Sequence, residues 1–266
     1  MDVRALAVDF GETLAERGAR PVGRVVADVL RGMPGAEVPD GFAAAYEHVH
    51  RITRIGDRVR DTHTAFADEI RHAAVLCGAR VPEPEGVAEL VFGRIEDSRV
   101  MRRAADALLR IRARRDLVCV LACDTRRPAS VRRRTLAEAG IEACFDAVVL
   151  SCEIGLRKPH PDFYAAVERA CGGVPRERIM FVGNTPAKDA TAPHLYGMQA
   201  VLIAPTGRPA GLADPIGVIA HFADLPDYLD RIDPAATPPA RRHPRPRSPT
   251  TAPPRRVGAH DPGHPE

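Results

Sequence analysis

The chain of 266 residues contains no tryptophan, and only two of its 38 basic residues are lysine. It also lacks long hydrophobic runs, because no segment approaches the roughly 20 apolar residues that a membrane-spanning helix needs. The first residues, MDVRALAVDFGET, hold only a short apolar run before Asp9. We therefore expect no signal peptide, no membrane association and a cytoplasmic location.

Cysteine is sparse, and its spacing excludes two common roles. Six cysteines are too few for a disulfide scaffold of this length, and no pair has the CxxC spacing of a zinc site. Most lie in apolar runs, so we interpret them as small core residues. Their positions are 77, 119, 123, 144, 152 and 171.

Charge and proline are unevenly distributed. Residues 233–266 hold six arginines against three acidic residues, which accounts for the whole net charge of +3, and ten of the 25 prolines. This segment has too few large apolar side chains to offset the entropy of ordering, so we predict a disordered tail. Arginines diluted by proline and without aromatic neighbours give no strong reason to expect nucleic-acid binding.

Short apolar runs alternate with helical periodicity along residues 1–232, as in α/β proteins with a Rossmann-like parallel sheet and helices on both faces. We predict strands at residues 5–9, 117–122, 145–150, 179–182 and 200–204. Amphipathic stretches such as VGRVVADVL, GFAAAYEHVHRI, AFADEIRHAAVL and GVAELVFGRI fill residues 20–98. We therefore predict an α/β core of residues 1–19 and 99–232, with residues 20–98 inserted as an all-helical domain.

Ligands of open parallel sheets bind beyond the carboxyl ends of the strands. There the sequence places Asp9, the segment ACDT with Asp124, the lysine of SCEIGLRKPHPDFY, and VGNTPAKDA with Asp189. A carboxylate nucleophile, a lysine and further oxygen ligands are suited to phosphoryl transfer through an aspartyl-phosphate, and Mg²⁺ to such an oxygen-rich site. The rarity of lysine supports a functional role for Lys158, since a basic position in this chain is nearly always arginine.

The segments SCEIGLRKPHPDFYAAV and IMFVGNTPAKDATAPHLYGM resemble the third and fourth motifs of the haloacid dehalogenase-like (HAD) hydrolase superfamily. The helical insert resembles the C1 cap of its subfamily I, which closes over the site and selects the substrate. The resemblance implies Asp9 as nucleophile with Lys158 as its catalytic partner. It also implies a small phosphorylated substrate and Mg²⁺, and leaves the oligomeric state open. The candidate phosphate-binding residues are Thr13, Cys123, Asp124 and Lys158, and the candidate metal positions are Asp9, Gly11, Asn184 and Asp189.

Three positions depart from the phosphatase pattern of that family. Gly11 stands where phosphatases carry the aspartate that acts as general acid and base, a contribution of about 10² to 10⁴ in rate. Glu12 is one residue out of register, and we expect its side chain to point elsewhere; Asp124 is a second possible substitute. A thiol at Cys123 donates a weaker hydrogen bond than a hydroxyl, and Asn184 offers a metal no negative charge.

Three functions remain open on the sequence alone. The first is a Mg²⁺-dependent phosphohydrolase of reduced or specialised activity. The second is a dehalogenase- or phosphonatase-type hydrolase, which needs no strong general acid, although the spacing of VGNTPAKD and the absence of tryptophan count against a dehalogenase. The third is a catalytically impaired binding or regulatory protein on the same fold.

Overall fold

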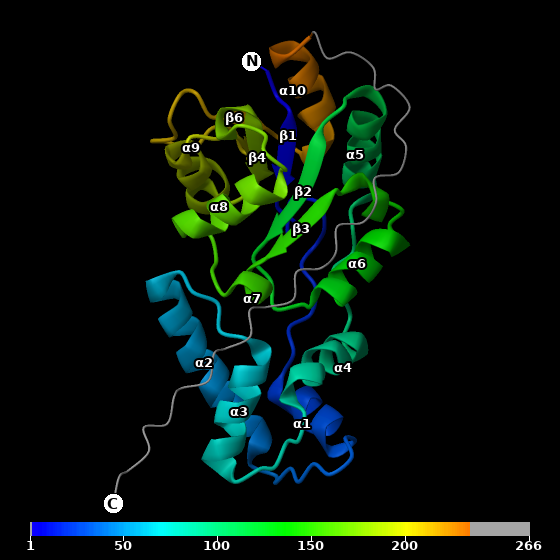
Figure 1. Ribbon diagram of the computed structural model, residues 1–266, viewed down its shortest axis with the longest axis vertical. Coiled ribbons are helices and arrows are strands. Elements are labelled where there is room, and N and C mark those ends of the chain that lie inside the picture. The colour runs from blue at the N-terminus through cyan, green and yellow to red at the C-terminus, as the bar shows by residue number, and fades with distance from the viewer. Residues whose placement is uncertain (1, 235–266) are drawn as a thin grey trace, which may run out of the picture.

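The computed structural model describes residues 2–234, and almost all of the predicted disordered tail lies outside them. A six-stranded, fully parallel sheet forms the centre of the larger part of the molecule, in the order β3-β2-β1-β4-β5-β6 (Figure 1). The strands are β1 (Ala5–Val8), β2 (Val118–Cys123), β3 (Ala147–Leu150), β4 (Ile179–Gly183), β5 (Gln199–Ile203) and β6 (Gly217–Ile219). The five predicted strands are confirmed, with ends shifted by one or two residues. Strand β6 was not predicted, because three residues at a sheet edge are too short to show a period of two.

The side chains of β1 alternate between two hydrophobic layers, as the pleat of a strand requires. Leu6 and Val8 pack into one layer, whereas Ala5 and Ala7 pack into the other. All four are fully buried, so β1 is covered on both faces. A continuous apolar run leading into a buried polar residue is therefore the expected sequence of this central strand.

Helices cover both faces of the sheet, as the sequence predicts. The first layer takes up apolar residues of α5 (Arg102–Arg114), α6 (Ala129–Glu138) and α10 (Leu225–Ile232). The second takes up residues of α8 (Pro161–Ala170) and α9 (Ala192–Tyr196). The short helix α7 (Ser151–Ile154) follows β3 directly. Short 3-10 turns lie at Pro84–Gly86 (η1), Glu142–Cys144 (η2), Arg176–Arg178 (η3) and Phe222–Asp224 (η5), and a π-helix, η4, spans Pro186–Thr191.

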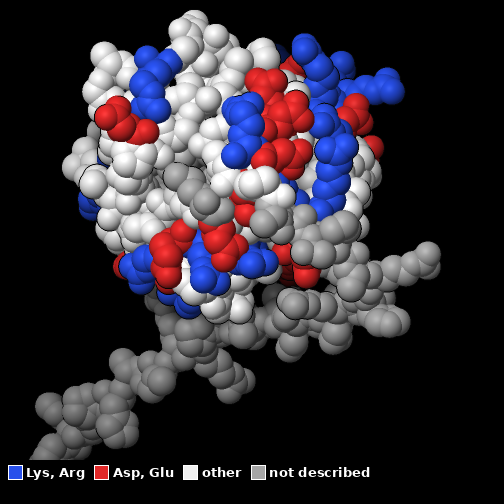
Figure 2. Space-filling model, turned by 90° about the horizontal axis from the view of Figure 1, so that it is seen from above, with Lys and Arg blue, Asp and Glu red and all other residues white. Residues whose placement is uncertain are grey.

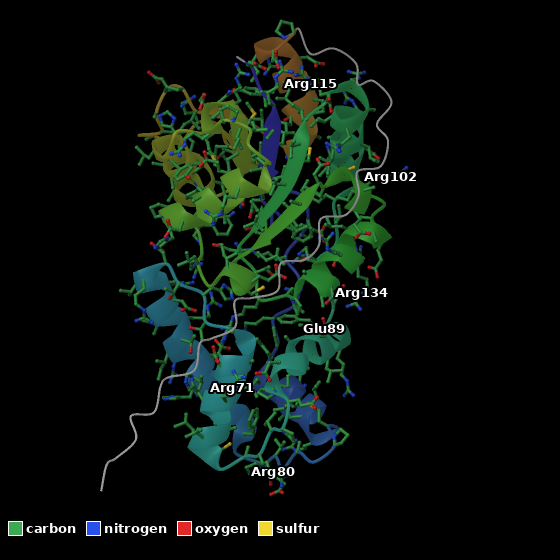
Figure 3. The ribbon with its side chains drawn as sticks, in the orientation of Figure 1. Arg71, Arg80, Glu89, Arg102, Arg115 and Arg134 are labelled. Carbon is green, nitrogen blue, oxygen red and sulfur yellow. The ribbon has the colours of Figure 1, made fainter. Side chains whose placement is uncertain are left out.

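The end of the sheet where the strands begin carries acidic and basic side chains next to one another (Figure 2). Arg115, whose side chain is 4% exposed, joins the end of α5 to Asp230 of α10 and to Asp233 (Figure 3). Arg110 pairs with Asp227 at the same end. These positive and negative charges on the described residues thus offset each other in pairs.

Residues 23–94, the helical region, form a separate group of helices beyond the carboxyl ends of the strands (Figure 1). Its helices are α1 (Gly23–Arg31), α2 (Phe42–Arg60), α3 (Phe66–Cys77) and α4 (Val87–Arg94), and each amphipathic stretch singled out in the sequence is helical. Their apolar faces enclose a core of their own, which includes Leu30, Tyr46 and Ile70. The region contacts α6, where Ser130 donates a hydrogen bond of 2.7 Å to Glu89. Figure 3 labels Glu89 on α4.

Two expectations from composition can be compared with residues 2–234. None of the helices there is both long and apolar enough to cross a membrane. All six cysteines are free thiols and each is buried or half-buried, in keeping with their interpretation as core residues.

Candidate active site

A cavity of about 410 Å³ lies at the carboxyl end of the sheet, between the strands and the helical region. Of the candidate site residues, seven line it: Asp9, Gly11, Cys123, Asp124, Lys158, Asn184 and Asp189. Thr13, the eighth, is buried beneath the cavity and hydrogen-bonds to Asp9. The structure therefore brings together every residue selected from the sequence.

Lys158 occupies the centre of this site. Its Nζ lies 2.7 Å from Asp9 Oδ1 and 2.7 Å from Asp189 Oδ1, and it donates a third, longer bond of 3.3 Å to the carbonyl oxygen of Ala122. The side chain is 2% exposed. A buried ammonium loses its hydration, and two carboxylates together with a carbonyl replace that hydration here.

Burial and charge act in opposite directions on the nucleophile candidate. Burial raises the pKa of Asp9 to about 6; Lys158 opposes this rise and Asp189 adds to it. Burial disfavours the ammonium of Lys158, yet the carboxylates of Asp189, Asp9 and Asp124 hold its pKa well above its ordinary value. Lys158 therefore stays charged, while Asp9 becomes a carboxylate only near neutral pH.

The turn that follows β1 holds the side chain of Asp9 in position. The amide groups of Leu14 and Ala15 donate to the carbonyl oxygen of Phe10, and this closes the turn over residues 10–15. Thr13 Oγ1 lies 3.3 Å from Asp9 Oδ2 and 3.5 Å from Asn184 Oδ1. The hydroxyl thus orients the carboxylate that the sequence selects as nucleophile.

Glu12 corrects an expectation. Its φ of 59° is left-handed, which is uncommon for a residue other than glycine, and its side chain, which is 45% exposed, lies at the edge of the site. Glu12 lines the cavity; Oε2 lies 3.5 Å from Asn184 Nδ2 and 2.5 Å from Arg17 NH2. Register along the sequence did not reveal this, because it does not contain the left-handed conformation of residue 12.

The π-helix η4 follows β4 directly and carries Asp189 into the site. The carboxylate accepts a hydrogen bond of 2.9 Å from the Thr185 amide, while its other oxygen faces Lys158. Gly183 is required beneath it, because a Cβ at that position would lie 2.5 Å from the Asp189 carboxyl carbon. An extra residue in the helical turn, as in other π-helices at functional sites, thus places Asp189 against the end of the strand.

Asp124 is engaged by basic groups on two sides. Oδ1 accepts a hydrogen bond from the Lys158 amide at 3.0 Å, and Oδ2 accepts one from Lys188 Nζ at 2.9 Å. Lys158 and Lys188 hold the pKa of Asp124 below its ordinary value despite its burial. A carboxylate that remains ionised is a poor proton donor, so this environment is unfavourable for Asp124 as a substitute general acid.

Cys123 ends β2 at the wall of the cavity and is buried. Burial raises the pKa of its thiol to about 12, so the group is neutral near pH 7. A neutral thiol is neither an activated nucleophile nor a strong donor to an anion. The thiol at this position is therefore confined to a weak contact with whatever occupies the cavity.

The donors at Asp9 and Asn184 fit a hard cation, since they are all oxygen atoms and both side chains lie within 3.5 Å of Thr13 Oγ1. Gly11 adds only main-chain oxygen at this point. Both carboxylates are already engaged: Asp189 by Lys158 and the Thr185 amide, and Asp9 by Lys158 and, more weakly at 3.3 Å, by Thr13. Within residues 2–234, no group of three or more His, Cys, Asp or Glu side chains could hold a metal. The donor set thus suits Mg²⁺ in chemistry and carries little negative charge.

Several residues that line the cavity were not selected from the sequence. The sequence did contain a clue to Lys188, because it is the second of only two lysines in the chain. Both lysines line this cavity. The sequence contained no clue to Arg54, because this residue lies on α2, far from any motif. The remaining members are contributed by the β1 turn, by the segment before α5, by the start of α6 and by the β4 loop: Phe10, Arg17, Gly18, Ser98, Thr125, Arg127, Arg132 and Thr185.

The segment that carries Lys158 is joined to the end of α2. The Arg157 amide donates to the Asp61 carbonyl at 2.9 Å, and the His63 amide donates to the Gly155 carbonyl at 2.8 Å. Ser151 Oγ lies 2.9 Å from His63 Nδ1, a further contact between the two parts of the chain. The helical region is therefore held close to Lys158 by main-chain hydrogen bonds.

A second contact between the parts is ionic. Arg126, just beyond β2, reaches Glu69 of α3 with both terminal nitrogens, one of them 2.6 Å from Glu69 Oε2. His50 Nδ1 lies 2.7 Å from the same guanidinium. Glu69 is completely buried, and the arginine supplies the charge that its carboxylate requires there.

Two curated proteins match part of the chain in sequence. Phosphoserine phosphatase from Thermus thermophilus is 35% identical over 99 residues, which cover 37% of this chain and 39% of that protein. Phosphoglycolate phosphatase from Cereibacter sphaeroides is 31% identical over 111 residues, which cover 41% of this chain and 49% of that protein. The chain thus spans less than half the length of each of these two relatives.

Solved structures match over a longer stretch at low identity, and they establish the fold alone. The 2-haloacid dehalogenase of Pseudomonas syringae aligns with a TM-score of 0.55 at 17% identity, covering 86% of this chain and 99% of that one. The L-2-haloacid dehalogenase of Xanthobacter autotrophicus gives 0.53 at 19% identity, covering 86% and 98%. A sequence model of haloacid dehalogenase-like hydrolases matches residues 3–195. The shared fold, the residues gathered around Lys158 and this match lead to one conclusion: the chain belongs to the haloacid dehalogenase-like hydrolase family.

Proposed function

We propose that the protein is a phosphohydrolase acting on a small phosphorylated metabolite, with Asp9 as nucleophile. One observation carries the proposal: Lys158 Nζ lies buried and 2.7 Å from the carboxylates of both Asp9 and Asp189, at the open end of the sheet. A nucleophilic carboxylate and a fixed cation within one cavity are the two groups that covalent phosphoryl transfer requires. The two phosphatase relatives support a phosphate ester as substrate.

In the first step the Asp9 carboxylate attacks phosphorus, the ester P–O bond breaks, and the leaving alkoxide takes a proton from a solvent water. Water then attacks the resulting aspartyl-phosphate and releases phosphate, which restores Asp9. Lys158 offsets the negative charge of both the carboxylate and the phosphoryl group, and Thr13 fixes the carboxylate through its hydrogen bond.

We propose Mg²⁺ as the cofactor, held by Asp9 and Asn184 with the main chain of Gly11. When bound, the cation supplies positive charge against the phosphoryl oxygens. Because Asn184 is neutral and Asp189 is engaged by Lys158, these residues bind the ion with low affinity. Dependence on millimolar rather than micromolar Mg²⁺ is the expected result of a titration.

We propose further that residues 20–98 act as a cap over a core of residues 1–19 and 99–232. The hydrogen bonds between residues 61–63 and 155–157 support this division, because they place the end of α2 beside Lys158. A cap in this position excludes water from the cavity and contributes side chains that select the substrate.

Asp9→Asn tests the proposal. An amide cannot form the acyl-phosphate, so turnover of phosphate monoesters should be abolished while the melting temperature stays close to that of the wild type. Asp106→Asn, on the exposed face of α5, is the matched control and should keep full activity. Assays should use a panel of alkyl and aryl phosphates with Mg²⁺, and 2-haloacids in parallel. Unchanged turnover in Asp9→Asn would exclude the covalent mechanism, and turnover of haloacids alone would identify a dehalogenase.

A further inference from the structure

A second cavity, of about 720 Å³ and open to solvent, lies along the exposed face of α2 in the helical region. Its lining includes four arginines, Arg20, Arg51, Arg54 and Arg58, and a single carboxylate, Glu47. Arg54 also lines the cavity that contains Asp9 and Lys158, so the two cavities meet at this side chain. A cavity of this size can accommodate the remainder of a small molecule whose phosphoryl group lies beside Lys158.

Positive charge in this second cavity is poorly compensated. Glu47 is already engaged, because it accepts hydrogen bonds from Arg20 at 3.2 Å and from the Gly23 amide at 2.7 Å. Within the described part of the chain, neither Arg54 nor Arg58 has an ion-pair partner. Their charges therefore face the cavity without a carboxylate of the protein to offset them.

The arginines also repel one another. Burial and the charges of Arg58, Arg157 and Arg20 hold the pKa of Arg54 below its ordinary value. The nearby His50 is affected in the same direction: burial and the charges of Arg126, Arg20 and Arg54 lower its pKa to about 4. Clustered cations of this kind raise the energy of the free protein, and a bound anion lowers it.

The position of Arg54 relative to Lys158 is held by the main chain. Arg54 lies in the last two turns of α2, and the residues after this helix pair with residues 155–157, which immediately precede Lys158. The main chain at the end of α2 is thus held beside the segment that carries Lys158, and the side chains of Arg54 and Lys158 line the same cavity. Such an arrangement selects substrates by the spacing of their charged groups.

We infer that the substrate carries a second anionic group, a carboxylate or a further phosphate, that binds Arg54 and Arg58 while its phosphoryl group lies beside Lys158. The inference rests on the proposed phosphohydrolase function and narrows its substrate class. It makes Arg54 a specificity-determining residue, contributed by the helical region rather than by the sheet.

The test compares phosphate esters that differ only at the far end. Three series with two to five methylene groups are assayed: uncharged alkyl phosphates, ω-carboxyalkyl phosphates and α,ω-bisphosphates. One chain length should give a charged substrate with kcat/KM about tenfold or more above that of the uncharged ester, the effect expected of charge-assisted hydrogen bonds. A carboxylate optimum and a bisphosphate optimum distinguish the two anions.

Arg54→Gln should remove this preference, so that the ratio of kcat/KM for the charged ester to kcat/KM for the uncharged ester of the same length falls to about one. Arg60→Gln, in the last turn of the same helix and outside the lining of both cavities, loses the same charge and should retain the preference. Binding of ω-carboxyalkyl phosphonates, measured by calorimetry, provides a readout that needs no turnover.

Each outcome bears on one proposal. Hydrolysis of uncharged esters with no gain from a second anion, or a gain that survives in Arg54→Gln, overturns the inference and leaves the phosphohydrolase intact. Failure to hydrolyse any ester overturns the proposed function, and phosphonate binding then decides the inference. If Arg54→Gln binds ω-carboxyalkyl phosphonates as tightly as Arg60→Gln does, Arg54 is not the anion site.

Discussion

Gly11→Asp restores a carboxylate at the position where the family's phosphatases have their general acid and base. The structure leaves room for it: a Cβ at Gly11 would meet no heavy atom within 4 Å, and the φ of Gly11 is not in the left-handed region. Backbone strain is therefore not expected to oppose the substitution. The cost that remains is electrostatic.

That cost can be compared with the gain. Two carboxylates about 6 Å apart at an effective dielectric constant of about 20 repel by about 3 kcal/mol, which raises the pKa of Asp9 by about 2. Since burial already raises the pKa of Asp9 to about 6, roughly a tenth of the nucleophile would be ionised at pH 7. General acid catalysis contributes about 10² to 10⁴. Alkyl phosphates should thus gain at least about 10- to 10³-fold, and aryl phosphates should lose at most about tenfold, since bound Mg²⁺ offsets part of the repulsion.

The assay measures kcat/KM for one alkyl and one aryl phosphate in wild type, Gly11→Asp and Gly11→Asn at saturating Mg²⁺ between pH 6 and 9. Gly11→Asn is the matched control, because an asparagine side chain has nearly the same shape as aspartate but no carboxyl group to donate or accept a proton. A circular dichroism melt verifies folding. A folded Gly11→Asp variant that changes both esters by the same factor would refute the reasoning, and would indicate that another group, with Glu12 the nearest candidate, already supplies the proton.

Three further predictions concern the same site. Because only ionised Asp9 attacks and its pKa is raised to about 6, kcat/KM should fall about tenfold per pH unit below that value; a flat profile from pH 7 to 4.5 would contradict this. Lys158→Met leaves two buried carboxylates unpaired and should lower the free energy of unfolding by about 3 to 5 kcal/mol. Denaturant titration should show that the double variant Lys158→Met, Asp9→Asn recovers part of that loss. An unchanged free energy of unfolding in Lys158→Met would exclude the argument that the two carboxylates need a buried cation. Cys123→Ser introduces a stronger donor and should lower KM about tenfold at similar kcat; an unchanged KM would show that position 123 does not contact the phosphoryl group.

The sequence by itself determined five of the six strands of the sheet. Four of these strands lead into polar residues that are suited to phosphoryl transfer. Apolar runs that end in Asp9, Cys123 or Asn184 are readable because buried parallel strands are continuous hydrophobic segments and their carboxyl ends share one edge. The helices of residues 23–94 were readable for a similar reason, since each has an apolar face with the period of a helix. Local patterns of this kind need no knowledge of distant contacts. Strand β6 lacked such a pattern and was missed.

Only the tertiary structure decided how the site is charged and enclosed. The place of Glu12 in the lining of the cavity is visible only in the folded turn, and the environment of Asp124 depends on Lys188, 64 residues away. Arg54 lines the cavity of Lys158 because main-chain hydrogen bonds bring the end of α2 to residues 155–157. Such contacts join segments far apart in the chain, and their energies depend on burial and distance, which no local pattern of residues contains.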